Sequence, residues 1–215
     1  MPPAGTTPRH KLISLVGFMG CGKTSIGRLL ASHLAWRFVD LDERIEEHTG
    51  LRITEIFDRL GEPAFREIEH ELLLRVLGEV GEQGRATVLA LGGGTFAQPR
   101  NVELLRQFGA MQAHVGAGGV APDPAGRGLG GIVIWLDCPT ELLLKRCVTM
   151  TDRPLFRDEA SFRQLYAQRL PFYQQADYRV ESNADPRRIV EQILALGVLE
   201  RGPGVADAST GKVSA

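Results

Sequence analysis

Short runs of apolar residues alternate with segments of helical period along most of the chain. Five of these runs have the length of a strand, and they cover residues 11–17, 37–42, 86–94, 132–137 and 178–182. The first and third, "KLISLVG" and "ATVLALGGG", are largely apolar and run into glycine. Such continuous runs indicate strands that are buried on both faces of a sheet.

Helical periodicity fills the segments between the predicted strands. In 23–34, apolar residues recur with the three- and four-residue spacing of one helix face. Further helices are expected at 41–79, with breaks near Gly50 and Gly61, and at 99–109, 139–148, 161–176 and 185–197. Asp185 is the expected N-cap of the last helix, with Pro186 in its first turn. Glycines at 109 and 197 are expected to end two of these helices.

The alternation of strand and helix predicts the fold class. Five such alternations indicate an α/β protein with a five-stranded parallel sheet, right-handed crossovers and helices on both faces. Ligands in such sheets bind beyond the carboxyl ends of the strands. The segment 17–24, the pair Asp40 and Asp42, and the glycines 92–94 each follow a different strand. We therefore expect all three to gather at one edge of the sheet.

The remaining segments suggest one folded domain over residues 11–197. Residues 1–10 and the tail 198–215 have the composition of disordered ends. The glycine-rich stretch 114–131 is expected to be a flexible insertion, and the polar stretch 149–160 a mobile loop. The sequence shows no internal repeat and no second compact domain.

Composition and charge argue against several classes of function. The chain has 215 residues, is 43% hydrophobic and has a formal net charge of −1, so no basic field indicates a nucleic acid partner. Its three cysteines form no C-x-x-C pair, which argues against structural zinc or a disulfide framework. No apolar stretch is long enough to span a membrane, and the N-terminus does not resemble a secretory signal. These features predict a cytoplasmic protein.

The segment "GFMGCGKT", residues 17–24, matches the pattern G-x-x-x-x-G-K-[ST] at a predicted strand-to-helix junction. Its glycines lack Cβ atoms, so the backbone can curl and direct several N–H groups at a phosphate. Lys23 supplies a charge for the β- and γ-phosphates, and Thr24 offers a hydroxyl to Mg²⁺. The alternative is a glycine-rich turn with a solvated Lys23. The pattern favours ATP or GTP with Mg²⁺ as the ligand.

A phosphate loop alone does not separate kinases from GTPases, motor ATPases or binding modules. The chain has no N-K-x-D guanine motif and is short for a motor ATPase, so a small-molecule kinase fits best. Asp40 and Asp42 could order Mg²⁺ through water and meet an acceptor hydroxyl, because strand periodicity would point both to one side. Capping of the next helix by either aspartate explains the same residues.

Basic residues farther along the chain are also open to two interpretations. Arg66 lies on an acidic helix, where an ion pair with Glu62 or Glu69 is the simpler explanation. Arg153 and Arg169 could be ordinary exposed cations. Glycines 92–94 could form a plain loop or let a substrate approach bare backbone N–H groups.

Taken together, these segments resemble the shikimate kinase family. The motifs are "GFMGCGKTSIGRLLA", "FVDLDERIEEHTG", "ITEIFDRLGEPAFREIE", "LALGGG", "RPLF" and "QRLPFY", in the family's order and spacing over residues 11–196. The resemblance implies a P-loop NTPase fold of the nucleoside-monophosphate-kinase type, with substrate-binding helices at about 41–79 and a lid at about 149–160. It also implies transfer of the ATP γ-phosphate to the 3-hydroxyl of shikimate, a step towards chorismate and the aromatic amino acids.

The resemblance also implies roles for single residues in the acceptor site. Asp40 corresponds to the aspartate linked to Mg²⁺, with Thr24 as the other metal-site residue. Asp42 corresponds to the catalytic aspartate that binds the shikimate hydroxyls. Arg66 and Arg169 correspond to the pair that grips the shikimate carboxylate, for which planar donors are suited. The expected substrate-binding residues are Asp42, Phe57, Phe65, Arg66, Gly92, Gly93, Gly94 and Arg169, with Phe57 and Phe65 in the pocket wall.

For the nucleotide, Arg146 corresponds to the arginine that packs on adenine, and Arg153 to the lid arginine that meets the transferring phosphate. Asp185 and Pro186 fall in the adenine loop. The expected nucleotide-binding residues are Gly17, Gly20, Cys21, Gly22, Lys23, Thr24, Ser25, Arg146, Arg153, Asp185 and Pro186. Lys23, Asp42 and Arg153 are the expected catalytic residues.

Two departures from the family pattern are visible. The insertion at 114–131 intervenes before the fourth strand, and the lid has "RPLF" where "RPLL" is commoner; neither removes a reacting group.

The alternatives to a shikimate kinase are another small-metabolite kinase, such as a gluconate kinase, and a non-catalytic nucleotide-binding relative. The expected partners are shikimate and ATP, with no nucleic acid or membrane, and the chain is expected to act as a monomer.

Overall fold

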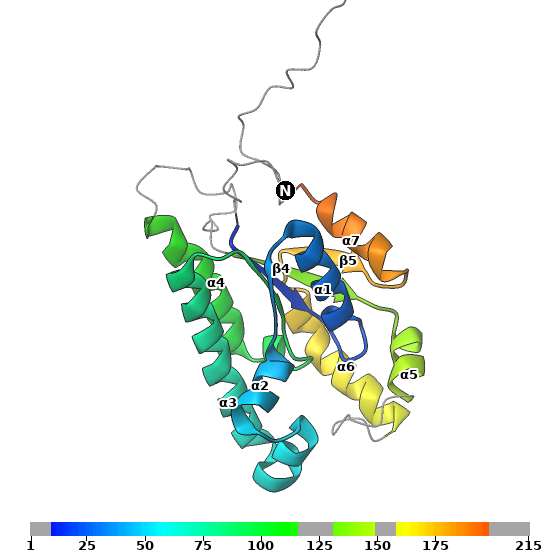
Figure 1. Ribbon diagram of the computed structural model, residues 1–215. Coiled ribbons are helices and arrows are strands. Elements are labelled where there is room, and N and C mark those ends of the chain that lie inside the picture. Colours follow the sequence, from blue (N-terminus) through cyan, green and yellow to red (C-terminus); the bar gives the residue numbers. More distant parts are fainter. Residues whose placement is uncertain (1–9, 116–130, 149–157, 198–215) are drawn as a thin grey trace, which may run out of the picture.

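Five parallel strands form one sheet in the order β2-β3-β1-β4-β5 (Figure 1). The computed structural model describes residues 10–115, 131–148 and 158–197. The strands are β1 (Leu12–Val16), β2 (Arg37–Asp40), β3 (Thr87–Ala90), β4 (Gly131–Asp137) and β5 (Tyr178–Glu181). The predicted α/β class and its five-stranded parallel sheet are confirmed.

The central strand β1 is buried along its whole length. It pairs with β3 through Leu15 and Ala90, and with β4 through Leu15 and Ile134. β3 is buried at every position as well. Helices must therefore cover both faces of the sheet, as the continuous apolar runs indicated.

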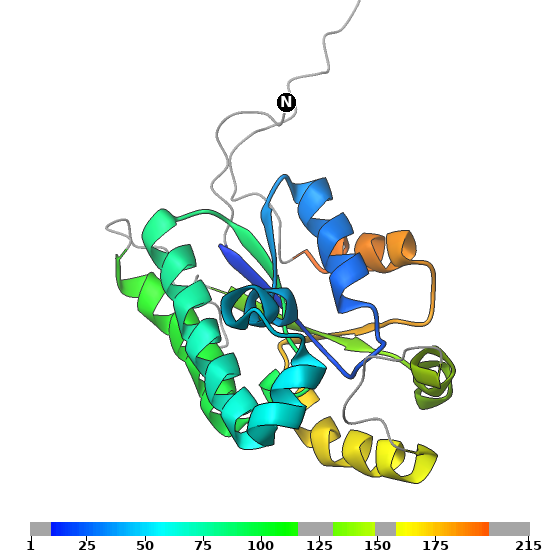
Figure 2. The ribbon, with the colours of Figure 1, turned by 60° about the horizontal axis from the view of Figure 1, so that its bottom comes forward.

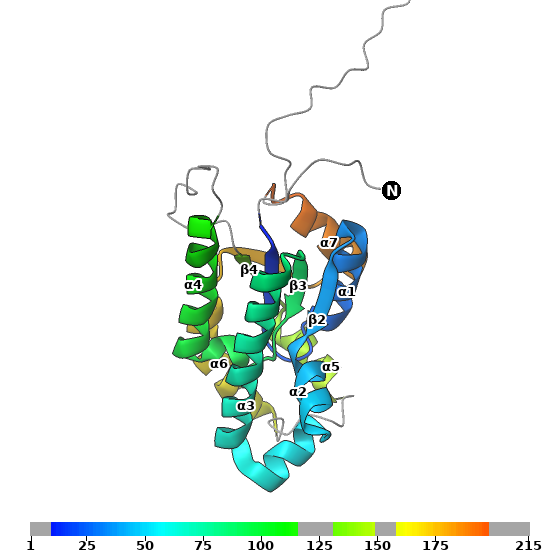
Figure 3. The ribbon, with the colours of Figure 1, turned by 60° about the vertical axis from the view of Figure 1, so that its left-hand side comes forward.

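The helices form a layer on each side of the sheet. α1 (Lys23–Leu34) and α7 (Pro186–Leu194) pack together on one side, and α4 (Pro99–Val115) and α6 (Glu159–Tyr173) lie on the other, as Figure 3 shows. α3 (Ile53–Gln83) runs beside α4 (Figure 2). The other elements are α2 (Leu41–Thr49), the short 3₁₀ helix η1 (Thr95–Ala97) and α5 (Thr140–Val148).

The predicted strand over 37–42 is two residues too long. β2 ends at Asp40 and α2 begins at Leu41. One carboxylate oxygen of Asp40 accepts hydrogen bonds from the backbone N–H groups of Asp42 at 3.0 Å and Glu43 at 3.4 Å. This N-cap starts the helix, so the capping role that the sequence left open is present. Asp42 therefore lies in the first turn of α2, and strand periodicity does not align it with Asp40.

The substrate-binding region predicted at 41–79 consists of α2 and α3, and both predicted breaks are present. Gly50 ends α2 with φ 67°, in the left-handed region. Gly61 interrupts α3 with φ 79° and ψ 167°, and Pro63 follows it. Glycine adopts these angles without the steric cost that a Cβ would add. α3 therefore bends at Gly61 before it continues beside α4.

Helix ends were predicted less well than helix positions. α4 continues through Gly109 to Val115, although glycine inside a helix costs about 1 kcal/mol relative to alanine. The buried side chains of Val102, Leu105 and Phe108 pack this helix onto the sheet, and that burial outweighs the local stop signal. α6 ends at Tyr173, before the predicted 176, and α7 ends at Leu194.

Several predictions fall wholly or largely outside the described residues. These are the disordered ends at 1–10 and 198–215, most of the insertion at 114–131 and most of the lid at 149–160, including Arg153. The described ends of the predicted insertion and lid belong to regular elements. Residues 114–115 are the end of α4, Gly131 is the first residue of β4, and Glu159 is the first residue of α6.

Among the described helices, none combines the length and hydropathy that a membrane span requires.

Candidate active site

The phosphate loop, residues 17–24, joins β1 to α1 with a backbone that requires glycine. Gly17 and Gly22 have φ values of 141° and 95°. A Cβ on Gly17 would lie 2.7 Å from the carbonyl oxygen of Leu136. Gly22 is the N-cap residue of α1 and has no side chain that could cap the first turn. The N–H groups of that turn, with the positive end of the helix dipole, can therefore face an anion.

Lys23, the first residue of α1, folds back over the phosphate loop. Its Nζ donates to the carbonyl oxygens of Gly17 at 2.9 Å and Phe18 at 3.0 Å. These carbonyls hold the ammonium group at the loop whose N–H groups would cradle a phosphate. The placement fits the predicted role of a phosphate clamp.

Thr24 and Asp40 bring a hydroxyl and a carboxylate together at the start of α1. Thr24 Oγ1 donates to Asp40 Oδ2 at 2.7 Å, while Asp40 Oδ1 caps α2. Asp40 is buried, and Ser25 follows Thr24 with an exposed side chain. The described residues contain no group of three His, Cys, Asp or Glu side chains that could hold a metal. A cation here would therefore take its ligands from these two oxygens, water and phosphate oxygens, the hard donors that Mg²⁺ prefers.

Two contacts tie the phosphate loop to the elements predicted to hold adenine. Arg146 Nη1, on α5, donates to the carbonyl oxygen of Gly20 at 3.1 Å. Ser182 Oγ donates to the carbonyl oxygen of Cys21 at 2.7 Å, which joins the loop after β5 to the phosphate loop. Asp185 caps α7 through the N–H of Arg187 at 2.9 Å, directly before Pro186. Arg146 and the segment before α7 thus lie at the same edge as Lys23.

Asp42 projects from the first turn of α2 towards the glycines after β3. A Cβ built on Gly92 would lie 2.7 Å from Asp42 Oδ1, 2.8 Å from Thr95 Oγ1 and 2.9 Å from Glu69 Oε1. Any side chain at Gly92 would therefore displace these groups. The predicted proximity of Asp42 and Gly92 exists, although Asp42 reaches it from a helix.

Arg66 forms the ion pairs that its sequence context suggested. Its Nη1 donates to Glu69 Oε2 at 2.9 Å, and its Nη2 and Nε donate to Glu62 Oε1 at 2.9 and 3.2 Å. Burial would lower the pKa of Arg66, but the two carboxylates outweigh it and raise the pKa above its ordinary value. A Cβ on Gly94 would lie 2.6 Å from Arg66 Nη2, so the guanidinium also lies against the glycine segment.

Arg169, on α6, lies beside the same glycines but has a different set of partners. Its Nη1 donates to the carbonyl oxygen of Gly93 at 3.1 Å, and its guanidinium lies 5.5 Å from the centre of the Phe18 ring. Only 6% of Arg169 is exposed, and no carboxylate of the described residues forms an ion pair with it. Burial lowers its pKa, and the positive charge of Arg66 acts in the same direction. A buried cation in this position would be stabilised by an anionic ligand.

The glycine segment joins the two halves of the site. A Cβ on Gly93 would lie 3.2 Å from the backbone nitrogen of Met19, in the phosphate loop, and 3.6 Å from Arg169 Nη1. Arg66 borders the adjacent Gly94. The structure therefore places the two arginines and the phosphate loop around one glycine segment.

Two aromatic residues of α3 were predicted to form the pocket wall. Their rings lie 4.6 Å apart between centroids; Phe65 is buried and Phe57 is half-buried. Arg66 lies 5.0 Å from the centre of the Phe65 ring. The apolar pair thus adjoins one of the arginines.

Two groups support these arginines: Glu69, which sequence reasoning named only as an ion-pair partner of Arg66, and Tyr173, which it missed. Glu69, whose side chain is 1% exposed, accepts hydrogen bonds from Arg66, from Thr95 Oγ1 at 2.6 Å and from Gln98 Nε2 at 2.8 Å. Tyr173 is fully buried, and its hydroxyl donates to the carbonyl oxygen of Gly93 at 2.5 Å. Helical spacing did predict the pairing of Glu69 with Arg66, but not the burial of Glu69 or its hydrogen bonds from Thr95 and Gln98. No local signal identified Tyr173.

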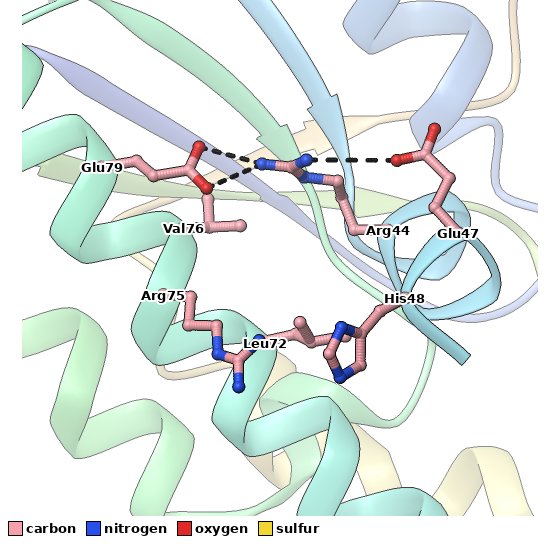
Figure 4. Close-up of a pocket in the computed structure, with 7 residues that line it drawn as sticks. All are labelled: Arg44, Glu47, His48, Leu72, Arg75, Val76 and Glu79. Atoms are coloured by element: carbon pink, nitrogen blue, oxygen red, sulfur yellow. Dashed lines mark hydrogen bonds and ion pairs between the residues drawn. The ribbon is translucent and has the colours of Figure 1, made fainter. Parts of the chain in front are cut away.

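A separate cavity of about 270 Å³ lies between α2 and α3 (Figure 4). Its lining residues are Arg44, Glu47, His48, Leu72, Arg75, Val76 and Glu79. Arg44 is already paired with Glu79 at 2.8 Å, and Arg75 with Glu71 at 2.5 Å. None of the predicted site residues lines this cavity, and its arginines already have carboxylate partners.

Comparison with known proteins gives one consistent family. The family model described as shikimate kinase matches residues 19–196. The shikimate kinase of Persephonella marina is 35% identical over 184 residues, which cover 85% of this chain and 96% of that protein. The structure of shikimate kinase from Acinetobacter baumannii in complex with shikimate aligns with a TM-score of 0.71. It is 36% identical, with 86% of this chain and 92% of that chain covered.

One of the alternative classes also appears among the similar structures. The gluconokinase of Sinorhizobium meliloti 1021 aligns with a TM-score of 0.50 over 86% of this chain and 90% of that chain. Its sequence identity is 17%, so the likeness shows the fold alone. The choice between acceptors must come from the family and from the site.

Proposed function

The chain belongs to the shikimate kinase family, and we propose that it transfers the γ-phosphate of ATP to the 3-hydroxyl of shikimate. Family membership makes it an ATP-dependent small-molecule kinase. One observation supports the acid acceptor above all others: Arg169 is buried beside Arg66 without a carboxylate partner among the described residues. A buried unpaired guanidinium favours a ligand that brings its own negative charge.

In this proposal Arg66 and Arg169 bind the carboxylate of shikimate. A planar guanidinium can form two parallel hydrogen bonds with a carboxylate, and such charge-assisted bonds are stronger than neutral ones. Glu69 holds one edge of Arg66 in place, and Tyr173 shares the Gly93 carbonyl with Arg169. Phe57 and Phe65 would cover an apolar part of the ring. The anchored acid end then fixes where the ring hydroxyls lie.

The phosphate loop would hold the triphosphate of ATP. The loop N–H groups and the start of α1 would face its oxygens, with Lys23 as the charged clamp and Ser25 in the same turn. Arg146 and the segment that carries Asp185 and Pro186 would bind the adenosine. Arg153 is proposed to meet the transferring phosphate, although it lies outside the described residues.

Thr24 and Asp40 are the residues proposed to bind Mg²⁺. Their oxygens lie 2.7 Å apart, and both are hard donors of the kind that Mg²⁺ takes. A bound Mg²⁺ would neutralise phosphate charge and help to align the triphosphate. Asp40 would keep its cap on α2 through its other oxygen.

Asp42 is proposed to orient the acceptor hydroxyl. The oxygen of that hydroxyl forms a bond to the γ-phosphorus while the bond from the γ-phosphorus to the β,γ-bridging oxygen breaks and ADP leaves. The hydroxyl proton leaves late in such a transfer, so Asp42 can accept it without an unusual basicity. Alignment and charge neutralisation supply most of the catalysis in this class of reaction.

Further proposals accompany the family assignment. The predicted site residues all come from one chain, so a monomer would suffice for activity. ATP is the phosphoryl donor, and the cytoplasm is the expected location. The product, shikimate 3-phosphate, would enter chorismate biosynthesis.

A coupled ADP-release assay tests the proposed function. Shikimate, gluconate and nucleoside monophosphates are offered separately, each with and without Mg²⁺. The proposal expects ADP release with shikimate and Mg²⁺ that exceeds the rate with every other acceptor. A higher rate with gluconate would support the alternative kinase, and no acceptor-dependent release would support a non-catalytic relative.

A further inference from the structure

The two carboxylates that pair with Arg66 differ in how tightly the fold holds them. Glu69 lies inside, with 1% of its side chain exposed, and three donors converge on it. Glu62 lies at the surface, with 50% of its side chain exposed, and among the described residues Arg66 is the one that donates hydrogen bonds to it. Glu69 is therefore fixed, whereas Glu62 can leave Arg66 without losing a buried position.

Glu62 occupies the edge of Arg66 that faces away from Glu69. Its Oε1 accepts from both Nη2 at 2.9 Å and Nε at 3.2 Å, while Nη1 is engaged by Glu69. That edge is the one left for a bidentate contact with a second carboxylate. Glu62 thus takes the donors that an acidic ligand of Arg66 would need.

The charge of Glu62 also reaches Arg169. The carboxylate is among the groups that raise the pKa of Arg169, against the larger effect of burial and the effect of Arg66, which both lower it. Its negative charge therefore acts on both guanidinium groups. An acceptor carboxylate bound by the arginine pair would have the same two electrostatic partners.

The backbone around Glu62 lowers the free-energy cost of breaking its ion pair with Arg66. Glu62 follows Gly61, whose φ of 79° and ψ of 167° interrupt α3, and it precedes Pro63. It therefore lies in the first turn of the helical segment that restarts at this bend. An acidic side chain there interacts favourably with the helix dipole even without an ion-pair partner.

We propose that Glu62 is a displaceable internal carboxylate, which occupies Arg66 until the carboxylate of the acceptor takes its place. The inference rests on the proposed function, because it requires an acidic acceptor at the arginine pair. Glu62 then lowers the affinity for the acceptor, since every binding event must break its ion pair. This cost falls on anionic ligands of Arg66, because an uncharged ligand has no negative charge with which to replace Glu62.

The test compares Glu62→Gln with a matched control on the same helix. Glu71→Gln removes the negative charge from an exposed i,i+4 pair with Arg75 and leaves the site unchanged. Shikimate is titrated into each protein by calorimetry without nucleotide, so that the measured Kd does not depend on turnover. Because ion pairs of this kind are weak, we expect Glu62→Gln to lower the Kd about two- to fivefold. Glu71→Gln should leave it unchanged.

The methyl ester of shikimate separates competition from a change in shape. The ester has no charge with which to displace Glu62, so Glu62→Gln should improve the binding of shikimate more than that of the ester. If Glu62→Gln binds shikimate no more tightly than the unmodified protein does, this inference is wrong while the proposed function stands. Weaker binding would assign Glu62 a role in positioning Arg66. If the wild-type protein fails to bind shikimate, the proposed function falls and this inference falls with it.

Discussion

Arg169 and Tyr173, four residues apart on α6, donate hydrogen bonds to the same acceptor, the carbonyl oxygen of Gly93, at 3.1 and 2.5 Å. Tyr173 is fully buried, and its ring stacks on Trp135 of β4 at 6.2 Å between centroids. The tyrosine is thus fixed by the sheet and fixes the glycine segment in turn. Arg169 takes its position from that segment.

Replacement of Tyr173 by phenylalanine should weaken acceptor binding more than nucleotide binding. The loss of one hydrogen bond costs about 1 kcal/mol, so the KM for shikimate should rise roughly fivefold. The KM for ATP should change by less than about twofold. Steady-state kinetics on Tyr173→Phe and on the edge-strand control Tyr178→Phe provide the comparison. Equal increases in both KM values would show a general loss of packing.

The sequence predicted the sheet and the edge where the candidate site lies, because both depend on local patterns. Buried strands require apolar runs, and the phosphate loop requires glycines before Lys23. The sequence misplaced Asp42, since strand periodicity and helix capping compete at Asp40 and capping determines the local structure.

The supporting residues of the candidate site could be predicted only in part. Arg66 and Glu69 share a helix, so their pairing follows from spacing. The contact of Tyr173 with Gly93 joins residues 80 positions apart, and no local pattern reports it. Gly109 shows the same limit for the fold, because tertiary packing of α4 overrides its stop signal.

Arg66→Ala should raise the KM for shikimate much more than the KM for ATP. Removal of a charged donor from a carboxylate costs roughly 2 kcal/mol, or about thirtyfold in affinity. The change also leaves Glu69 buried without its cation, so Arg66→Lys is needed as a variant that keeps the charge. The exposed Arg75→Lys is the control. Similar effects on both substrates would assign Arg66 a structural role only.

Lys23→Ala should greatly slow phosphoryl transfer while the protein stays folded. A lost phosphate clamp removes about 3 kcal/mol or more of transition-state stabilisation, measured as kcat/KM. Lys11, which precedes β1 at the opposite end of that strand, supplies the control Lys11→Ala. Near-normal turnover by Lys23→Ala, with an unchanged unfolding midpoint, would exclude the proposed clamp.

Two substitutions at Asp40 should separate its cap from its proposed metal role. Asparagine also caps helices well, so Asp40→Asn should keep most of the stability while it raises the Mg²⁺ concentration required for activity. Asp40→Ala should lose both, with a fall of about 1 kcal/mol in the free energy of unfolding. Urea denaturation and Mg²⁺ titration of the rate provide the two readouts. Unchanged Mg²⁺ dependence in Asp40→Asn would leave Asp40 with the cap alone.

The central claim is that buried Arg169, with Arg66, binds the carboxylate of the acceptor beside the phosphate loop. The most direct test is a calorimetric titration of the unmodified protein with shikimate and with its uncharged methyl ester. Loss of the charge should cost about 3 kcal/mol, so the ester should bind roughly a hundredfold more weakly. Equal affinities for the acid and the ester would contradict the claim.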